Sequence, residues 1–456
     1  MNLTAGVGEA IKFEKMKKSP SDLFHRLSNA FQAPTTMVGC VCPSQNDGQH
    51  GLVGGHAYSM NGTFKYGNTL LVRLRNPWGC QEWSGPWSDG SREMAQAGSA
   101  IPHPNKDDGE FYMDIDNFLR YFEQCTICNI TPDFDRDGTG DTLSYITTIY
   151  GNWREGKAGG FQNKLQNPAY CVTVNDDGAD GSGKVPLVVQ VVQKTSDRQD
   201  DKIAIRVDLY KVLHEDSKFI VLDELGDKNN LYLVDFSSSY RFSVAPGRYV
   251  AIPSTMNGSD ENPKVLKEFL IRFFSAGPLT NPAEVQDSTK IIAGKGPELD
   301  VQGKTMELPI TKCMPGRFEG GFNAGGQISC RDTFATNPQC FLTIREPQTI
   351  KVEIMQPDPD DPNAKMPLGI KLFKAEKSNF PADYEFLVSN YDKAVPDTSG
   401  NDGPFSYGNS VDCGYCLDPG TYLLIVHSNG PDDQNDFALA IYSERNNEIE
   451  TYNFAP

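Results

Sequence analysis

The residues with the clearest capacity for chemistry are His56 and Asn76. An alternating run covers 56–60, Asn and Gly residues are frequent between 61 and 68, and residues 70–75 alternate apolar and basic side chains. This pattern predicts a β-hairpin with a loop over 61–68. The first residue of one strand and the last residue of its partner meet at the open end of a hairpin, so we expect His56 and Asn76 to lie side by side.

A neutral imidazole oriented by a side-chain amide suits a thiolate mechanism. The His takes up and returns a proton, while the Asn fixes the tautomer and orientation of the ring without adding a charge. Spacing alone leaves a second interpretation open, because a single His beside a strand is often a purely structural residue. The sequence around the two residues therefore bears on the choice.

Five segments of the first part of the chain, GHAYS, VRLRNPWG, EWSGPWSD, DDGEFYM and CNITPD, resemble the second half of the calpain catalytic core. The resemblance runs from about Leu3 to Asp133. It implies a papain-like Cys/His/Asn mechanism in which His56 is the general base and acid and Asn76 orients its ring. It also implies that Trp78 shields their hydrogen bond from water, which strengthens the bond by lowering the local dielectric. A plain core tryptophan is the structural alternative.

The nucleophile of this mechanism is not evident in the sequence. In calpains a first catalytic subdomain supplies the nucleophilic Cys and an oxyanion-stabilising Gln, and we expect neither within these 456 residues. Cys40 and Cys42 lie in the run MVGCVCPS, which predicts a buried strand rather than a Gly-rich turn entering a helix. Cys80 follows the Asn76 motif and offers no better context. Because losing one member of such a unit costs orders of magnitude in rate, we expect no peptide hydrolysis from this polypeptide alone.

The same resemblance implies a calcium site. Calcium prefers about six to eight oxygen ligands, and a Gly between two carboxylates lets the backbone turn so that both face one point. The implied ligands are the side chains of Glu82, Asp89, Asp108 and Glu110 and the backbone carbonyl of Lys106. Calcium is the only cofactor that we expect.

A second acidic segment, TPDFDRDGTGD, has the spacing of the first half of an EF-hand loop. The matching positions are Asp133, Asp135, Asp137 and Gly138. Its twelfth position is Ser144, where an EF-hand has a bidentate Glu, and the flanking segments predict strands instead of helices. We therefore interpret this segment as a flexible acidic linker and expect calcium at the first site.

Beyond this segment the chain contains two copies of one module. The matched blocks, in the same order, are 167–174 with 337–344, 245–252 with 418–425, and 268–275 with 436–443. Each copy has short alternating runs separated by Gly, Pro, Asn and Asp, the pattern of an antiparallel β-sandwich. Tyr249 and Tyr422 follow Pro-Gly turns and are expected to bury their rings. The first copy resembles the calpain-type sandwich that follows the catalytic core, and in the second copy Phe318 or Phe322 stands near the position of Trp153.

We therefore predict a mainly β, multidomain protein. A papain-like second catalytic half, an antiparallel sheet with a few helices, covers 1–135, and two antiparallel β-sandwiches cover 136–285 and 286–456. No apolar run approaches membrane-spanning length, and the N-terminus lacks a signal-peptide pattern. The odd number of cysteines, 11, favours reduced thiols, so we expect a cytoplasmic protein.

The net charge of −18 argues against nucleic acid as a partner, since no basic stripe is present to neutralise phosphates. No penta-EF-hand domain is evident, so the regulatory small subunit of calpains is not expected as a partner. The predicted function is calcium-dependent cysteine endopeptidase activity, limited intracellular proteolysis of protein substrates, with the Cys-bearing half missing. The alternative is a non-catalytic calpain-like module that binds membrane lipid or a protein partner through its two sandwiches.

Overall fold

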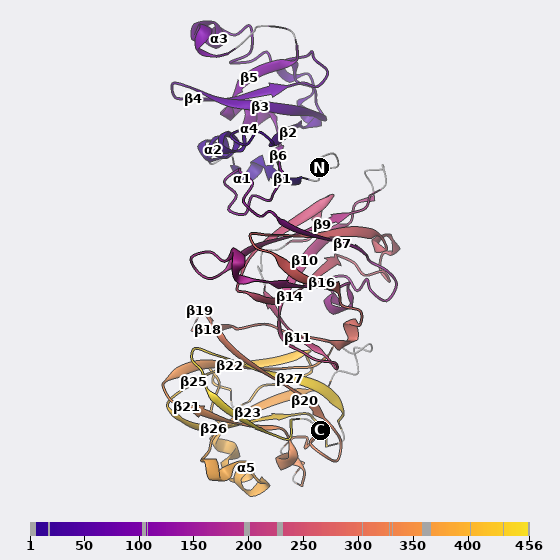
Figure 1. Cartoon of the computed structure of the whole chain (residues 1–456), viewed down its shortest axis with the longest axis vertical. Helices are drawn as coiled ribbons and strands as arrows, with labels where there is room; N and C mark the ends of the chain where they lie inside the picture. The colour runs from indigo at the N-terminus through magenta and orange to yellow at the C-terminus, as the bar shows by residue number, and fades with distance from the viewer. Residues whose placement is uncertain are drawn as a thin grey trace.

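The computed structural model describes residues 6–454 apart from short gaps. The gaps are 17–18, 103–105, 107, 196–200, 226–230, 303, 328, 331, 358–365, 402 and 432. Strands account for 46% of the residues and helices for 16%, so the prediction of a mainly β protein is confirmed. Figure 1 shows an elongated molecule in which three units follow one another along the long axis. Among the described helices, none is long and apolar enough to cross a membrane.

A six-stranded antiparallel sheet forms the N-terminal unit. Its strand order is β1-β6-β2-β3-β4-β5, which places the predicted hairpin, β3 and β4, within the sheet rather than at its edge. The elements are β1 (Val7–Lys12), α1 (Phe13–Met16), α2 (Pro20–Ala30), β2 (Met37–Cys42), β3 (His56–Tyr66), β4 (Thr69–Arg75), α3 (Arg92–Ala97), β5 (Glu110–Asp114), α4 (Ile115–Tyr121) and β6 (Gln124–Asn129).

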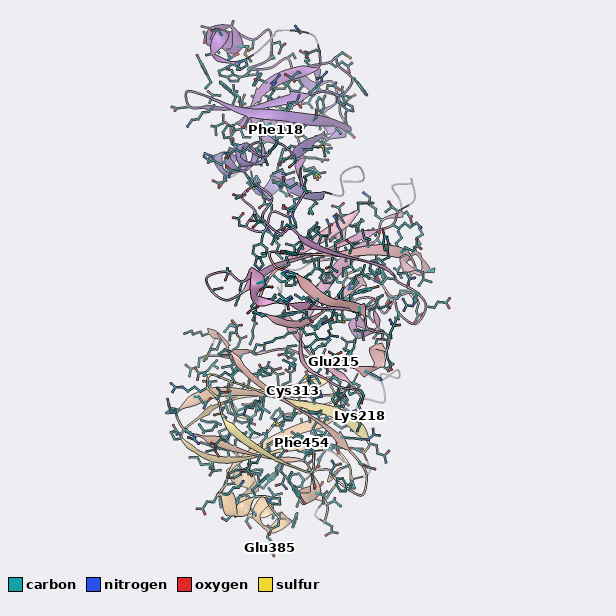
Figure 2. The ribbon with its side chains drawn as sticks, in the orientation of Figure 1. Phe118, Glu215, Lys218, Cys313, Glu385 and Phe454 are labelled. Atoms are coloured by element: carbon teal, nitrogen blue, oxygen red, sulfur yellow. The ribbon has the colours of Figure 1, made fainter. Side chains whose placement is uncertain are left out.

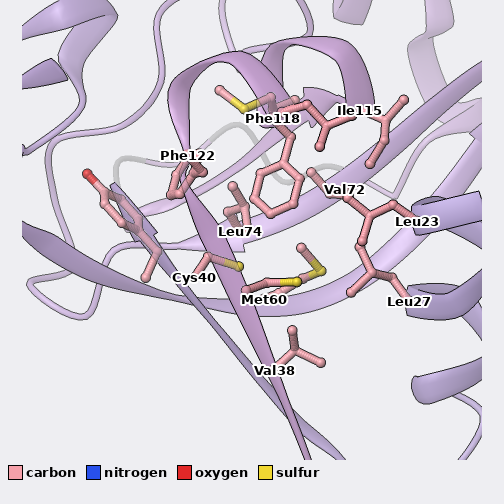
Figure 3. Close-up of a cluster of buried hydrophobic side chains, with 14 of the residues drawn as sticks. Leu23, Leu27, Val38, Cys40, Met60, Val72, Leu74, Ile115, Phe118 and Phe122 are labelled. Atoms are coloured by element: carbon pink, nitrogen blue, oxygen red, sulfur yellow. The ribbon is translucent and has the colours of Figure 1, made fainter. Parts of the chain in front are cut away.

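Helices α2 and α4 cover the sheet through a fully buried apolar cluster (Figure 3). Leu23 and Leu27 lie one turn apart on α2, and Phe118 projects from α4 toward Val72 and Leu74 of β4. Burying an aliphatic or aromatic side chain of this size stabilises a fold by about 1.5–3 kcal/mol. This cluster therefore packs β4 against the helices and fixes the position of Asn76, which follows β4.

Strands β3 and β4 form a longer hairpin than the sequence predicts. β3 continues through the expected loop to Tyr66, and the turn consists of Gly67 and Asn68 alone. Gly67 has a φ of 56°, a left-handed conformation that a two-residue turn requires and that Gly adopts without strain. The register shifts between Met60 and Gly62, a β-bulge that the two Asn/Gly signals in the sequence did not distinguish from a loop.

The middle unit is a β-sandwich, as predicted, and its strands pair antiparallel except for β11 and β17. One sheet has the order β16-β8-β14-β10-β11-β17 with β12 beside β10, and the facing sheet has the order β13-β9-β15-β7. Buried apolar side chains from both sheets fill the space between them. The strands are β7 (Tyr145–Asn152), β8 (Tyr170–Val174), β9 (Val185–Gln193), β10 (Ala204–Glu215), β11 (Ile220–Leu225), β12 (Leu233–Val234), β13 (Ser237–Val244), β14 (Gly247–Thr255), β15 (Glu268–Ser275), β16 (Leu279–Glu284) and β17 (Ile291–Gly294).

The C-terminal unit is a second antiparallel sandwich, preceded by a two-stranded hairpin. Its sheets have the orders β20-β27-β22-β25 and β24-β23-β26-β21-β28, and Phe454 closes its core (Figure 2). The elements are β18 (Glu298–Val301), β19 (Lys304–Glu307), β20 (Ile310–Phe318), β21 (Gln339–Ile344), β22 (Gln348–Met355), β23 (Leu368–Lys374), α5 (Tyr384–Asn390), β24 (Phe405–Ser406), β25 (Ser410–Leu417), β26 (Gly420–His427), β27 (Asn435–Ser443) and β28 (Glu448–Tyr452).

A buried Asn organises the same loop in both sandwiches. The Asn167 side chain accepts a hydrogen bond from the N–H of Gly160 at 3.3 Å and donates to the carbonyl of Gly160 at 3.0 Å. The Asn337 side chain accepts from the N–H of Gly325 at 2.9 Å and donates to the carbonyl of Gly326 at 2.8 Å. Both side chains are fully buried, so the repeated Asn-Pro word marks a structural amide that satisfies a loop backbone.

The aromatic positions of the two copies also correspond. The rings of Trp153 and Phe269 pack with centroids 4.3 Å apart, and those of Phe318 and Phe437 pack with centroids 4.6 Å apart. Phe318 is fully buried whereas 49% of the Phe322 surface is exposed, so Phe318 is the counterpart of Trp153.

The two Pro-Gly-x-Tyr tyrosines bury their rings, as predicted. Each hydroxyl donates to the carbonyl four residues upstream: Tyr249 to Ala245 at 2.6 Å and Tyr422 to Asp418 at 2.9 Å. A buried phenol needs such a partner, because an unbonded hydroxyl would lose its hydration without compensation. The turn and the tyrosine therefore stabilise each other in both copies.

The two sandwiches share a buried interface. Strand β17 follows residue 285, where the sequence suggested a boundary, yet it pairs in parallel with β11 of the first sandwich. Apolar side chains from both sandwiches and the connecting segment form one cluster, and Figure 2 places Cys313 at this junction. The cluster comprises Phe219, Val221, Ile292, Leu299, Leu308, Met355, Ala438, Ala440 and Tyr442. The sandwiches are therefore joined by packing and by strand pairing.

Two carboxyl groups share one hydroxyl at this interface. Tyr442 donates to Asp223 Oδ1 at 2.6 Å, and its hydroxyl lies 3.4 Å from Glu353 Oε2. Burial raises the pKa of Asp223 to about 7; the Tyr442 hydrogen bond, Lys351 and Lys211 oppose this shift, and Glu353 adds to it. Burial also raises the pKa of Glu353. The interface therefore binds protons more tightly than the unfolded chain does.

We expect Asp223→Asn to flatten the pH dependence of stability between about pH 4 and pH 7. The folded Asp223 carboxyl has a raised pKa, so its contribution to stability is complete below the unfolded value of 3.8 and is lost as the pH rises through about 7. An amide keeps the acceptor for Tyr442 and does not titrate. Thermal unfolding of both proteins at several pH values measures the difference, and equal pH slopes would contradict the assignment.

Candidate active site

The hairpin brings the predicted pair together. His56 is the first residue of β3, and Asn76 directly follows β4. Antiparallel pairing of Ser59 with Arg75 puts the start of β3 and the end of β4 at the same, open end of the hairpin. His56 Nε2 lies 2.9 Å from Asn76 Oδ1, a hydrogen-bond distance. The local strand pattern is therefore sufficient to explain how two residues twenty positions apart meet.

The Asn76 amide can occupy only one orientation. Its Nδ2 donates to the carbonyls of Cys80 at 2.8 Å and Gln81 at 3.2 Å, and its Oδ1 accepts from the N–H of Trp78 at 3.1 Å. A carbonyl cannot donate, so Nδ2 must face these two acceptors and Oδ1 must face the imidazole. His56 Nε2 therefore carries the proton in the neutral ring, and Nδ1 is left as the basic atom.

Two aromatic rings flank the imidazole. The Trp78 ring lies 4.4 Å from the His56 ring between centroids, and the Tyr58 ring lies 5.2 Å from it in an edge arrangement. Trp78 is 59% exposed, so the core-tryptophan interpretation is wrong. Tyr58 is buried and accepts a hydrogen bond from the N–H of Val53 at 2.8 Å. The sequence analysis missed Tyr58, although its position two residues after His56 places it on the same face of β3.

The two thiols of β2 are buried and protonated. Cys42 pairs directly with His56 in the sheet register, and burial raises the pKa of its thiol to about 11. Burial also raises the pKa of Cys40 well above its usual value. Because the thiolate is the nucleophilic form, neither side chain is suited to attack a carbonyl. The prediction that this run forms a strand is confirmed, but only alternate residues are buried: Val38, Cys40 and Cys42 lie in the core, whereas Met37 and Gly39 are exposed.

A turn at Gly109 connects the backbone of Asn76 to the predicted calcium residues. The N–H of Asn76 donates to the carbonyl of Gly109 at 2.8 Å. On the other side of the turn, Glu82 Oε1 accepts from the N–H groups of Asp108 and Gly109 at 3.0 and 2.8 Å. Gly109 has a φ of 84°, and a Cβ there would lie 2.7 Å from the Asn76 carbonyl oxygen. This turn therefore needs Gly.

The predicted calcium residues are close in the fold but only partly arranged as ligands. Glu110 pairs with Arg73 of β4 and accepts from Asn61 Nδ2 at 2.8 Å. The carbonyl of Lys106 accepts from the N–H of Asp108 at 2.9 Å. No three of the carboxylates of Glu82, Asp89, Asp108 and Glu110, all within the described residues, have ligand atoms within 4.8 Å of one another. The oxygen atoms of these residues are suitable calcium ligands, but the ion pair with Arg73 competes with calcium for Glu110.

Three other carboxylates do converge. Across the described part of the chain, the only group of this kind is Asp133, Asp135 and Asp141, whose ligand oxygens lie within 4.8 Å of one another. The loop folds around Asp133, which is buried and accepts from the N–H groups of Asp137 and Gly138 at 3.0 and 2.9 Å. The flexible-linker interpretation is therefore wrong. Asp141 falls on the ninth position of the EF-hand spacing, so the sequence pattern did contain this third carboxylate, although the Ser at the twelfth position argued against a calcium loop.

This loop also links the N-terminal unit to the first sandwich. Arg241 of β13 donates through Nε to the carbonyl of Asp133 at 2.9 Å and pairs with Glu9 of β1. Arg26 of α2 lies 3.4 Å from an Asp133 carboxylate oxygen and 3.5 Å from one of Glu9. Burial raises the pKa of Asp133, an effect that hydrogen bonding to the N–H of Gly138 and the two arginines oppose. Any ion bound in the loop would therefore act on the contact between two units.

Family models match most of the chain. The model described as calpain family cysteine protease matches residues 1–129. The model described as calpain large subunit, domain III, matches twice, over 149–274 and 314–442, and these two segments make up more than half of the chain. The chain belongs to the calpain family. The two domain III matches coincide with the two sandwiches, which the internal repeat had indicated.

Several curated calpains are similar to this chain over part of their length. The calpain-2 catalytic subunit of Bos taurus is 29% identical over 310 residues, covering 60% of this chain and 43% of that protein. The calpain-1 catalytic subunit of Macaca fascicularis is 31% identical over 314 residues, covering 60% and 42%. This calpain chain thus spans less than half the length of these relatives. The solved structure of PNGF-II aligns with a TM-score of 0.23 and 6% identity over 88% of this chain and 83% of that one, too low to indicate a shared fold.

We expect Gly109→Ala to destabilise the N-terminal unit by about 2–4 kcal/mol, combining a left-handed backbone with overpacking. The added methyl group would meet the backbone of Asn76, Gly79 and Cys80. Gly67→Ala is the matched control, because Gly67 also has positive φ but no atom within 4 Å of its Cβ position. It should lose about 1–2 kcal/mol, the backbone part alone.

Urea unfolding followed by tryptophan fluorescence measures both changes, since three of the four tryptophans lie in this unit. Equal losses for the two variants would mean that the Gly109 turn does not press on the Asn76 backbone.

Proposed function

We propose that this calpain chain supplies the general base and its orienting amide to a calcium-dependent cysteine endopeptidase. The observation that carries the proposal is the 2.9 Å contact between His56 Nε2 and Asn76 Oδ1, with the amide fixed by its own donors. A structural His would not require a buried amide whose oxygen is directed at one ring nitrogen. The substrates are proteins, as the protease family implies.

In the proposed reaction a thiol is presented to Nδ1 of His56 by a second, Cys-bearing catalytic segment. Nδ1 accepts the thiol proton, and the thiolate attacks the peptide carbonyl carbon. The imidazolium then gives the proton to the amine as the C–N bond breaks. Water attacks the thioester while it gives a proton to the same nitrogen, the C–S bond breaks, and the released thiolate regains that proton. Asn76 holds the Nε2–H throughout, and the Trp78 ring covers one face of the imidazole.

The proposal predicts that the chain is inactive alone and gains calcium-dependent proteolysis when mixed with a Cys-bearing first subdomain of a calpain. A fluorogenic peptide reports the restored rate. His56→Ala should lower that rate by more than about a thousandfold, because the base is lost. His25→Ala, which removes an exposed His on α2, is the matched control and should retain the rate.

Asn76→Ala should lower the restored rate by about tenfold or more, the value of one orienting hydrogen bond. Restored cleavage that survives His56→Ala would contradict the assigned base.

A second candidate, a non-catalytic binding module, is favoured by the buried interface between the sandwiches. This interface makes the larger part of the chain one continuous scaffold. If mixing with first subdomains restores no cleavage while the chain still binds a protein or lipid partner, the binding function is the better account.

We further propose that calcium binds at Glu82, Asp89, Asp108, Glu110 and the Lys106 carbonyl. Glu82 is already held at the Gly109 turn, and Glu110 would exchange its pair with Arg73 for the ion. When bound, the ion would tie this turn, and through it the Asn76 backbone, into one arrangement. The Asp133, Asp135 and Asp141 group is the competing location.

Calorimetric titration of the full chain with calcium distinguishes the two locations. Asp108→Asn with Glu110→Gln should weaken binding by at least about tenfold, because two charged ligands are lost. Asp135→Asn with Asp141→Asn removes the same charge from the other loop and should leave that binding unchanged. Loss with the second pair only would move the site to the Asp133 loop, and absence of heat at millimolar calcium would exclude both.

A further inference from the structure

Strand β13 has an open edge. It pairs with β9 on one side and ends the sheet on the other. Gln193 donates its N–H to the carbonyl of Phe236 at 3.1 Å, and hydrogen-bonded pairs recur at every second residue of an antiparallel ladder. The backbone of Phe242 therefore faces β9, and the backbones of Arg241 and Ser243 face outward. Within the described residues, no partner is present for the main-chain N–H and C=O groups of these two residues.

A cavity of about 760 Å³ lies against this edge. It is lined by the four consecutive residues 241–244. Successive side chains of a strand point to opposite faces, so a cavity that touches four in a row lies beside the strand and not over one face. The cavity is also lined by residues 412–414 of β25, an edge strand of the second sandwich, and by Pro297 and Leu299 of the connecting segment. The volume is within the range of about 300–1,000 Å³ that ligand sites occupy.

The walls of the cavity are acidic. The lining carboxylates are Glu224, Glu298, Asp300, Glu307, Asp397 and Asp412. Four basic residues also line the cavity, and all four pair with carboxylates: Arg206 with Asp208, Arg241 with Glu9, and Lys295 and Lys351 both with Asp412. The lining carboxylates outnumber the lining cations by two, and Asp412 is already neutralised. The excess of negative charge therefore favours a positively charged ligand and opposes nucleic acid or an anionic lipid.

The two strand edges that border the cavity are not equally available. On β25 the carbonyl of Gly414 already accepts from the N–H of Thr398 at 2.8 Å. On β13 two outward residues, Arg241 and Ser243, are spaced as the alternate residues of an added strand would need. The edge of β13 is therefore the surface on which a further strand can form.

We propose that this cavity binds an extended, lysine- or arginine-rich peptide segment of a partner protein, which adds a strand to the edge of β13. Main-chain hydrogen bonds to Arg241 and Ser243 supply the part of the affinity that does not depend on the peptide sequence. Alternate basic side chains of the peptide contact the acidic walls and supply the specificity. The site lies between the two sandwiches and is independent of the reaction proposed for His56. It gives the tandem arrangement a role that neither sandwich has by itself, because each contributes one wall.

The probe is a fluorescent acetyl-(Lys-Val)₄-amide peptide, titrated against the full chain and followed by anisotropy. The control peptide has the same sequence with N-methyl groups on alternate residues, which preserve its charge and remove the backbone donors. We expect the control to bind at least about tenfold more weakly, the value of losing main-chain hydrogen bonds. Equal affinity for the two peptides, or no binding of the first, would overturn the proposal.

Two variants locate the site. Ser243→Pro removes an outward N–H that β9 does not use, and should weaken binding of the first peptide by about tenfold, whereas Ser243→Ala keeps the N–H and should not. Amide exchange at Arg241 and Ser243 should slow when the peptide is bound. If Ser243→Pro fails to fold, the exchange measurement and the N-methylated control still decide the question, and unchanged exchange at both residues would refute strand addition.

Discussion

The arrangement of the residues around His56 depends on the buried side-chain amide of Asn76, whose N–H donors and oxygen acceptor must find hydrogen-bond partners within the protein. Two carbonyls in the segment that follows take up the donors, and this leaves the oxygen for the N–H of Trp78 and the ring of His56. An unbonded amide in such a place would cost about 1–3 kcal/mol. The turn of residues 76–81, the orientation of the imidazole and the position of Trp78 are therefore consequences of one side chain meeting its hydrogen-bonding requirement.

The same principle recurs farther along the chain, where a buried Asn fixes one loop in each sandwich. Asn167 and Asn337 bond backbone groups that a loop cannot pair for itself. The Asn76 amide orients the His56 ring, whereas the Asn167 and Asn337 amides only bond the backbone of a loop. Burial and hydrogen bonding alone therefore do not distinguish a functional Asn from a structural one; the nature of the group on its oxygen does.

Local patterns in the sequence were enough to predict the hairpin, the His56 and Asn76 pair, and the repeat. Strand alternation and turn residues act over a few positions, so the ends of a hairpin can be located without knowledge of the rest of the fold. Interactions between distant segments could not be read in the same way. Arg73 pairs with Glu110 because β4 and β5 are neighbours in the sheet, and Arg241 of β13 pairs with Glu9 of β1 because the first sandwich meets the N-terminal unit there.

The boundary that the sequence predicts between the sandwiches, near residue 285, is a second case in which a short pattern does not reveal the fold. Turn residues between two repeats predict a break in the chain, and the strand that follows them looks like part of the second copy. Parallel pairing with β11 depends on where the chain returns in space, which depends on the interface between the sandwiches. No pattern over a short window contains that information.

The pairing of β17 with β11 has a consequence for how the two copies can be separated or exchanged. β17 lies just before the hairpin β18-β19, yet it completes the outer edge of the first sandwich. A cut between the repeats at residue 286 would leave β11 with an unpaired edge and the second copy with an orphaned strand. The duplicated modules are thus no longer interchangeable units: transplanting the first into another protein requires the segment through Gly294 to travel with it.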